Sequence, residues 1–217
     1  MNLVFNSNHF MYLLQGAGWT LVLSLIAFVG GGLVGFVVAL CRISPVRPLR
    51  WVSTAYVQLV QGTPLLILMF LAYFGLSIVG LSLPALVAAG ISMTIYVSAY
   101  IGEIWRGCIQ AVPRTQWEAA ECLALSKVQR MRLVVLPQAL RIATPPTVGF
   151  MVQIVKNTSL AATIGFVELV RAGQMINNAT FRPFVVFVLI AALYFALCYP
   201  LSAWSQRLER RFDVAHR

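Results

Sequence analysis

Charged residues are scarce in this sequence, and their absence from long stretches excludes a water-soluble globular protein. Only 10% of the 217 residues are Asp, Glu, Lys or Arg, whereas 60% are hydrophobic; an average soluble domain has roughly 25% charged residues. Three runs, 1–41, 51–102 and 183–206, contain no charged residue at all. A helix that crosses a bilayer core needs about 20 apolar residues. The sequence therefore predicts an all-α membrane protein.

Histidine, cysteine and lysine are also rare, which argues against several kinds of site. The two histidines, His9 and His216, lie near the termini, and the four cysteines form no C-x-x-C pair. Neither a metal centre nor a histidine-based catalytic centre is predicted from such material. A nucleotide-binding P-loop needs a lysine directly after a glycine, and neither Lys127 nor Lys156 follows one. We expect a chain that is not an enzyme and that binds no cofactor itself.

Five membrane-spanning helices in a single domain are predicted from the uncharged runs. The run 51–102 is too long for one span at 1.5 Å per residue, and Gly80 and Pro84 favour a break within it. Pro145 and Pro146 predict a kink or a helix start. The first run has no basic segment before it, so we expect it to stay in the mature protein. The predicted spans are 19–41, 52–79, 84–105, 138–158 and 183–205.

The basic residues indicate which side of the membrane each connection faces. They gather after the first, third and fifth predicted spans, and are absent before the first span and between the second and third. Cytoplasmic connections carry an excess of Lys and Arg, so we expect the amino terminus outside and the carboxyl terminus in the cytoplasm. The connection 156–182 then lies outside, with a short helix over 157–167 packed into the bundle. This placement explains the net charge of +10 without nucleic-acid binding.

The connection 111–133 is predicted to be structured, because it contains two helix-start signals. Thr115 and Glu118 have the spacing of a capping box, and Ser126 and Gln129 have the same spacing. In such a box the two side chains satisfy each other's free backbone amides. We therefore expect one helix to begin at each pair.

The residues 118–141, EAAECLALSKVQRMRLVVLPQALR, resemble the EAA loop of the permease subunits of bacterial ABC importers. The segments 61–76, 99–113 and 155–174 resemble the polar amino-acid branch of that family. The resemblance implies a type I importer permease in the bacterial inner membrane, with a cytoplasmic coupling helix between the third and fourth spans. Such a chain forms half of the translocation pathway for a polar amino acid.

The same resemblance implies the partners. They are a second permease subunit, either another copy or a paralogue, a dimer of cytoplasmic ABC ATPases that use ATP and Mg, an external amino-acid-binding protein, and the surrounding membrane lipid. Energy then comes from the partner ATPase, in agreement with the missing P-loop.

The coupling residues that the resemblance implies lie in the EAA loop. We expect Glu118 to meet a basic residue of the ATPase, while Ala119 and Ala120 keep one helix face small enough for a groove on that partner. Pro137 ties the loop to the following span. The family's glycine falls at Ala124; if this turn needs a positive φ, alanine costs roughly 1 kcal/mol there.

Polar residues in the second span are candidates for the substrate path, because polar groups inside a membrane usually face a cavity. Gln58, Gln61 and Thr63 lie where Gly62 and Pro64 interrupt the helix near the middle of the membrane. Loose backbone carbonyls and amide side chains at such a break can contact a substrate. Hydrogen bonding between helices is the alternative role for these residues.

The third and fourth spans supply further candidates. Gln153, Lys156 and Asn157 have i, i+3, i+4 spacing and should share one face, followed by Thr158 and Ser159. The family commonly has an acid at Asn157, so its absence argues against a strictly basic substrate. On the third span, Tyr100 either lines the cavity or packs in the core. Glu103 either receives a substrate ammonium or pairs with Arg106 at i+3.

Two other functions remain open from the sequence. An ion-coupled secondary transporter would use Lys156 and Glu103 as coupling sites, although such carriers usually contain internal repeats and none is visible. A membrane anchor for a cytoplasmic enzyme would need the structured loop but no polar helix faces.

Overall fold

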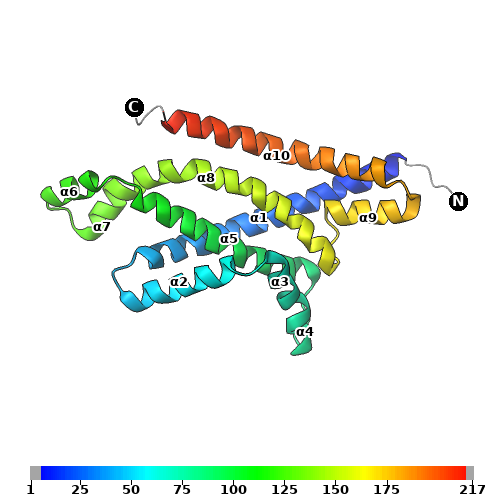
Figure 1. Ribbon diagram of the computed structural model, residues 1–217, viewed down its shortest axis with the longest axis horizontal. Helices are drawn as coiled ribbons and strands as arrows, with labels where there is room; N and C mark the ends of the chain where they lie inside the picture. Colours follow the sequence, from blue (N-terminus) through cyan, green and yellow to red (C-terminus); the bar gives the residue numbers. More distant parts are fainter. Residues whose placement is uncertain (1–5, 214–217) are drawn as a thin grey trace.

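A computed structural model describes residues 6–213, so that His216 lies outside the described part. It contains four long helices, α1 Ser7–Ile43, α5 Ala85–Gln110, α8 Leu136–Asn157 and α10 Pro183–Asp213, which run alongside one another in Figure 1. No strand occurs among the described residues. The shorter elements are α2 Arg47–Gln61, α3 Leu65–Phe70, η1 Leu71–Gly75, α4 Leu76–Ile78, α6 Arg114–Cys122, α7 Lys127–Gln129, η2 Arg130–Val135, η3 Thr158–Ile164 and α9 Leu169–Thr180.

The helices α1 and α5 pack closely because small residues line their contact. A Cβ atom added at Gly35 would lie 3.0 Å from the carbonyl oxygen of Ser98 on α5, closer than most real Cβ atoms approach a neighbour. Small residues allow membrane helices to approach at backbone distance. The core beside this contact contains the fully buried Leu23, Met93 and Val97. The contact between α1 and α5 is the most extensive between two helices, and both helices also contact α2 and α8.

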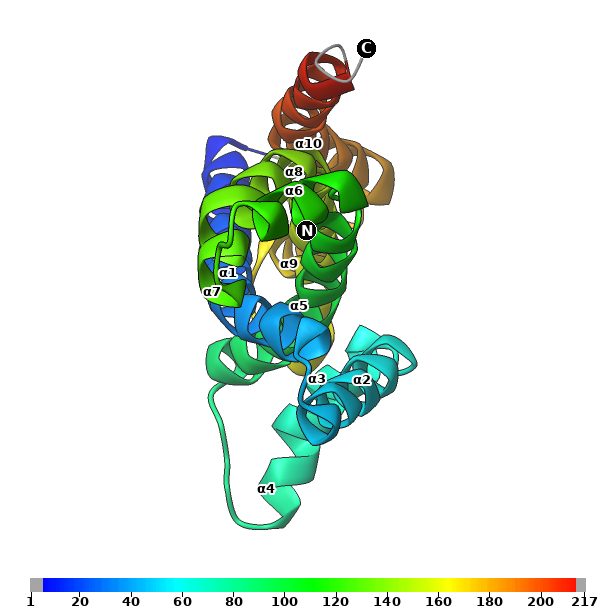
Figure 2. The same ribbon diagram turned by 90° about the vertical axis from the view of Figure 1, so that its left-hand side faces the viewer.

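The second predicted span, 52–79, is sharply bent at the interruption that Gly62 and Pro64 predict. The segments 47–61 and 65–78 meet at 98°, and α4 points away from the bundle in Figure 2. Pro64 has no amide hydrogen to continue the helical ladder, and Gly62 donates its own amide to Gln58 O at 2.9 Å as a helix cap. The Thr63 hydroxyl turns back to Leu59 O at 2.8 Å. The predicted interruption is therefore present, but it is a corner rather than a kink.

The first helix is longer than predicted. It begins at Ser7 rather than near residue 19, because Asn6 and His9 form a capping box at its start. The 37 residues of α1 span about 55 Å, more than the roughly 30 Å of hydrocarbon in a bilayer. This extension was not predicted, because the residues before Trp19 are uncharged but include several polar side chains.

The end of α8 that lies away from α6, here called its outer end, leads into η3 and α9. Pro145 and Pro146 lie inside α8, so a helix does not start there, and the Pro145 carbonyl accepts a hydrogen bond from Ser205 of α10 at 3.0 Å. The expected short helix over 157–167 is the 3-10 turn η3. The helix α9 was not predicted at all.

Three of the helices, α1, α5 and α10, are each long and apolar enough to cross a membrane alone. Two bent pairs, 47–61 with 65–78 and 127–164 with 169–180, bring the total to five if each pair is counted as one span. The predicted number of spans agrees with this upper count.

Candidate coupling helix and substrate path

The first residues of the EAA loop, 118–122, form the second half of α6, which lies at one end of the molecule (Figure 1). The helix begins at Arg114 with Pro113 as its cap, and no side chain caps it, so the capping box predicted for Thr115 and Glu118 is wrong. A proline before the first turn already provides a residue in extended conformation at that position. The second predicted box is confirmed, since Ser126 and Gln129 satisfy each other's backbone amides.

Two faces of α6 differ in exposure. Glu118 and Ala119 are exposed, whereas Ala120 is only 2% exposed. The expectation that both alanines contact a partner is therefore wrong for Ala120, which packs toward its own chain. A partner can reach this helix through Glu118, Ala119 and their exposed neighbours.

The turn after α6 requires the left-handed conformation that a glycine would favour. Ala124 has a φ of 56°, and alanine pays a steric penalty of about 1 kcal/mol in this region. The turn is closed by hydrogen bonds from Ala124 N to Glu121 O at 2.9 Å and from Leu125 N to Ala120 O at 3.2 Å. An ion pair of 3.0 Å between Arg130 and Glu121 crosses it.

The coupling elbow, residues 111–135, is anchored to both neighbouring helices. A buried cluster joins Ile109 of α5 to Val135 and Ala139 at the base of α8, and Trp117 of α6 packs against it. The π-helical turn η2 runs without a gap into α8, whose first turn contains the exposed Pro137. The helix α6 is therefore connected by packing to both α5 and α8.

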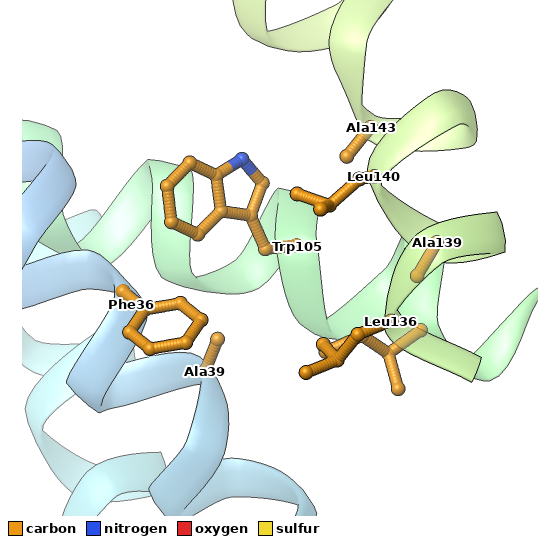
Figure 3. A pocket seen from close by; sticks show the side chains of 8 residues that line it. Phe36, Ala39, Trp105, Leu136, Ala139, Leu140 and Ala143 are labelled. Atoms are coloured by element: carbon orange, nitrogen blue, oxygen red, sulfur yellow. The ribbon is translucent and has the colours of Figure 1, made fainter. Parts of the chain in front are cut away.

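A small apolar crevice lies beside the elbow where α1, α5 and α8 meet. Its volume is about 30 Å³, room for roughly one water molecule. Figure 3 shows Phe36 and the Trp105 ring on one side and Leu136 on the other. The walls are almost entirely carbon, and the Trp105 indole N–H donates to Thr147 at 2.9 Å. Such a crevice does not suit a polar amino acid. Its lining residues are Phe36, Ala39, Trp105, Ile109, Leu136, Ala139, Leu140 and Ala143.

Glu103 is held in an ion-pair network rather than left free. Arg42 of α1 lies 3.0 Å from one carboxylate oxygen of Glu103, and Arg106 binds both oxygens. Arg42 also donates to Thr54 of α2. The predicted pair with Arg106 is present, and a role as receiver of a substrate ammonium is disfavoured because both oxygens are already paired. Arg42 was missed because it is 61 residues away in the sequence.

A polar and aromatic face lies between α5 and α8. The Tyr100 ring stacks on Phe150 with a centroid distance of 5.5 Å and contacts Tyr96 at 4.5 Å. Next to these rings, the Gln153 amide donates to the Asn157 side-chain oxygen at 3.0 Å, and Asn157 also interacts with Tyr96. These residues provide ring faces and amide groups without a formal charge.

Lys156 does not share this face as predicted. It is exposed and, with residues of α10, lines a separate hollow of about 250 Å³ that opens to the surface. The other lining residues are Val152, Tyr194, Phe195, Cys198, Tyr199 and Ser202. Gln153 and Asn157 therefore belong to one polar group and Lys156 to another.

The remaining candidates from the sequence differ in accessibility. Gln58 and Gln61 are exposed at the end of α2, beside the partly buried Thr63 at the corner. Thr158 is fully buried and donates to Val155 O at 2.8 Å, so its hydroxyl is used within the fold. The Ser159 hydroxyl likewise donates to Lys156 O at 2.7 Å.

One polar residue with a structural role was not anticipated. Glu168 is 0% exposed and caps α9, accepting hydrogen bonds from Val170 N and Arg171 N at 2.9 Å each. Tyr194 of α10 donates to the same carboxylate at 3.0 Å. The sequence signal for this role is an acidic residue, Glu168, directly before a helical pattern, since acidic residues are preferred at helix starts.

Comparison with known proteins identifies the family. Residues 31–214 match the family described as "Binding-protein-dependent transport system inner membrane component". This chain belongs to that family. The permease is 36% identical over 94% of its length to the probable amino-acid ABC transporter permease protein YckA of Bacillus subtilis, covering 90% of it. It is 35% identical to the probable glutamine ABC transporter permease protein GlnM of the same organism, over 100% of both chains.

Solved structures agree with this assignment. A crystal structure of an amino acid ABC transporter with histidines has a chain 34% identical to the permease, with a TM-score of 0.91, covering 97% of this chain and 100% of that one. The methionine ABC transporter MetNI has a TM-score of 0.79 at 20% identity, covering 95% and 99%, and shows the shared fold. The predicted fold class, an all-α type I importer permease, is confirmed.

Proposed function

We propose that this permease is one of two transmembrane subunits of an ATP-driven importer for a polar amino acid. The second subunit is another copy or a paralogue, and two cytoplasmic ABC ATPases with ATP and Mg supply the energy. An external amino-acid-binding protein delivers the substrate. The observation that carries this proposal is α6, an exposed helix anchored to both α5 and α8 at the base of the bundle.

The coupling mechanism follows from that anchoring. Glu118 and Ala119 are the exposed contact residues of α6, and Glu118 is positioned to pair with a basic residue of the ATPase. When the ATPases close, they push α6, and the elbow moves α5 and α8 as one body. Rigid-body motion of packed elements is a common way of switching between states, and here it alternates access to the path.

The substrate path is best supported at the polar face between α5 and α8. The rings of Tyr96 and Tyr100 can hold an ammonium group by cation–π attraction, and the amides of Gln153 and Asn157 can donate and accept hydrogen bonds. We place Gln58, Gln61 and Thr63 further along the path, whereas Lys156 faces the separate hollow beside α10. Because this face contains no free carboxylate, we infer a neutral polar amino acid, in line with the glutamine named for GlnM.

The orientation follows from the basic residues. The ends of α1, α5 and α10 that carry arginines face the cytoplasm of a bacterial inner membrane. The amino terminus then lies outside and the carboxyl terminus inside, which places α6 on the side where ATPases are found.

Uptake into vesicles tests the proposal. Vesicles that contain the permease with its ATPase, supplied with the binding protein on the opposite side, should accumulate the amino acid only with ATP on the ATPase side, and should continue when ion gradients are collapsed. An ion-coupled secondary transporter would stop when the gradients collapse. A membrane anchor would show no uptake at all.

The variant Glu118→Lys tests the coupling step within the same assay. It should remain in the membrane but lose uptake by roughly tenfold or more, because a charge reversal at a docking contact costs more than about 1.4 kcal/mol. Glu209→Lys, an equal reversal at an exposed residue of α10, should leave uptake unchanged. Normal uptake by Glu118→Lys would refute the role of α6.

A further inference from the structure

The C-terminal part of α10 is a basic segment that stands away from the other helices (Figures 1 and 2). Its last hydrogen bond to another helix, among the described residues, is made by Ser205 to Pro145 at 3.0 Å. Around and beyond this point, a hollow of about 480 Å³ is lined by Trp204, Arg207, Leu208, Arg210 and Arg211. We call it the arginine hollow.

The arginines of this hollow differ from those in the bundle. Arg42, Arg106 and Arg130 each form an ion pair with a glutamate of the permease. Among the side chains that the structure describes, the last of which is that of Arg211, none forms an ion pair with Arg207, Arg210 or Arg211, and these three arginines are exposed. The hollow therefore presents three positive charges that the fold itself does not neutralise.

The spacing of the lining residues suits a membrane surface. Trp204, Arg207 and Arg211 have i, i+3, i+7 spacing and lie on one face of α10. Trp204 is 50% exposed, and tryptophan rings are enriched at the boundary between hydrocarbon and headgroups. Only 17% of the apolar stretch of α10 is buried in the protein, so the apolar surface that leads to the hollow is largely uncovered by the rest of the chain.

We propose that the arginine hollow binds the phosphate of an anionic phospholipid in the cytoplasmic leaflet. The guanidinium groups of Arg207 and Arg211 bind the phosphate oxygens, for which their planar donors are suited, while Trp204 packs beside the glycerol and upper acyl chains. The apolar, lipid-facing stretch directly before the hollow favours a lipid over the acidic surface of a soluble protein. The assignment to the cytoplasmic leaflet rests on the proposed orientation.

Lipid retention by the complete transporter tests this proposal. The permease–ATPase complex is released from nanodiscs of equal parts phosphatidylglycerol and phosphatidylcholine, and its bound lipids are counted by native mass spectrometry. We expect retained phosphatidylglycerol in the wild type. Each of Arg207→Gln and Arg211→Gln should lower its bound ratio about fivefold, the effect of one basic residue at an anionic surface.

The control Arg47→Gln/Arg50→Gln removes two exposed arginines from the start of α2 and should leave retention unchanged. An equal loss in this control would mean diffuse attraction and overturn the proposal. So would an Arg207→Gln/Arg211→Gln complex that keeps its lipid but loses the ATPase subunit, since the hollow would then be a protein contact.

A second measurement needs no arginine substitution. The emission of Trp204 is obtained by subtracting the fluorescence of Trp204→Phe from that of the wild type. It should be quenched more strongly by brominated phosphatidylglycerol than by brominated phosphatidylcholine, and equal quenching would contradict a specific site. Neither measurement requires transport, and nanodiscs offer both leaflets. Failure of amino-acid uptake is therefore distinguishable from failure of lipid binding.

Discussion

The two ends of α8 have similar features, a left-handed turn and a nearby glutamate, but the two glutamates differ in how deeply they are buried. Each leads to a turn with a left-handed residue, Ala124 with a φ of 56° at the coupling elbow and Gly165 with a φ of 87° at the outer end. Each has a nearby glutamate. Glu168 at the outer end is fully buried, whereas the Glu121 side chain at the coupling elbow is 69% exposed.

This difference suggests that the two ends have different roles, one structural and one in contact with a partner. The outer end is completed by its own residues, since Glu168 accepts bonds from α9 and α10. The coupling elbow leaves its charges in solvent and carries a strained alanine where glycine would fit better. An ATPase that docks on the elbow can supply the contacts that the permease alone lacks.

The largest effect is expected from Glu168→Ala at the outer end. The substitution leaves two backbone amides and the Tyr194 hydroxyl without their acceptor in a buried site, which costs about 3 kcal/mol of unfolding free energy. Thermal unfolding of the purified complex in detergent should show a clearly lower midpoint. Glu168→Gln keeps one acceptor oxygen and should lie between the wild type and Glu168→Ala; equal midpoints for all three would contradict the structural role of the carboxylate.

An exchange at the two left-handed turns should give opposite, smaller effects. Ala124→Gly relieves backbone strain and should raise the unfolding free energy by about 0.5–1 kcal/mol, after allowing for the greater freedom of glycine in the unfolded chain. Gly165→Ala should lower it by about 1 kcal/mol, since no atom lies within 4 Å of the added Cβ and only the backbone is strained. Chemical denaturation measures the unfolding free energy of both variants. Changes of the same sign would refute the claim that alanine is strained at the first turn and glycine is required at the second.

The smallest effect is expected from Glu121→Gln. The Glu121 side chain is 69% exposed, although that of Arg130 is only 16% exposed, and solvent around the carboxylate limits such an ion pair to a few tenths of a kcal/mol, roughly 0.5 at most. The midpoint of thermal unfolding should therefore barely move, and the small difference from the wild type should shrink further at high salt. If Glu121→Gln lowered the unfolding midpoint as much as Glu168→Ala, the coupling elbow would depend on its own ion pair as strongly as the outer end depends on Glu168, contrary to the account.

Much of this fold was predictable because a membrane restricts what a sequence can do. Uncharged runs located the long helices, Pro64 located the break in the second span, and the Ser126 capping box located the start of α7. The angle of the break was not predictable, since proline and glycine end a helix without fixing where the chain goes next. The early start of α1 was hidden for a similar reason, because a single Asn6 cap decides it.

The candidate site was predictable only where neighbours in sequence are neighbours in space. The Glu103–Arg106 pair and the Gln153–Asn157 contact follow from helical spacing. Arg42 joins Glu103 only through the packing of α1 on α5, and Lys156 turns toward α10 rather than toward Gln153. Ala120 faces its own chain for the same reason, because tertiary packing decides which side of α6 is buried.

The most direct test of the account is a cross-link between α6 and the ATPase. A reagent that joins a thiol to a lysine amine is applied to the assembled transporter with Ala119→Cys in a Cys122→Ser background, and the products are separated by mass. The account predicts a covalent permease–ATPase product, and none from Ser82→Cys, an exposed position between α4 and α5. An assembled complex in which Ala119→Cys yields no such product, or in which Ser82→Cys yields it instead, would contradict the claim that α6 is where the ATPase acts.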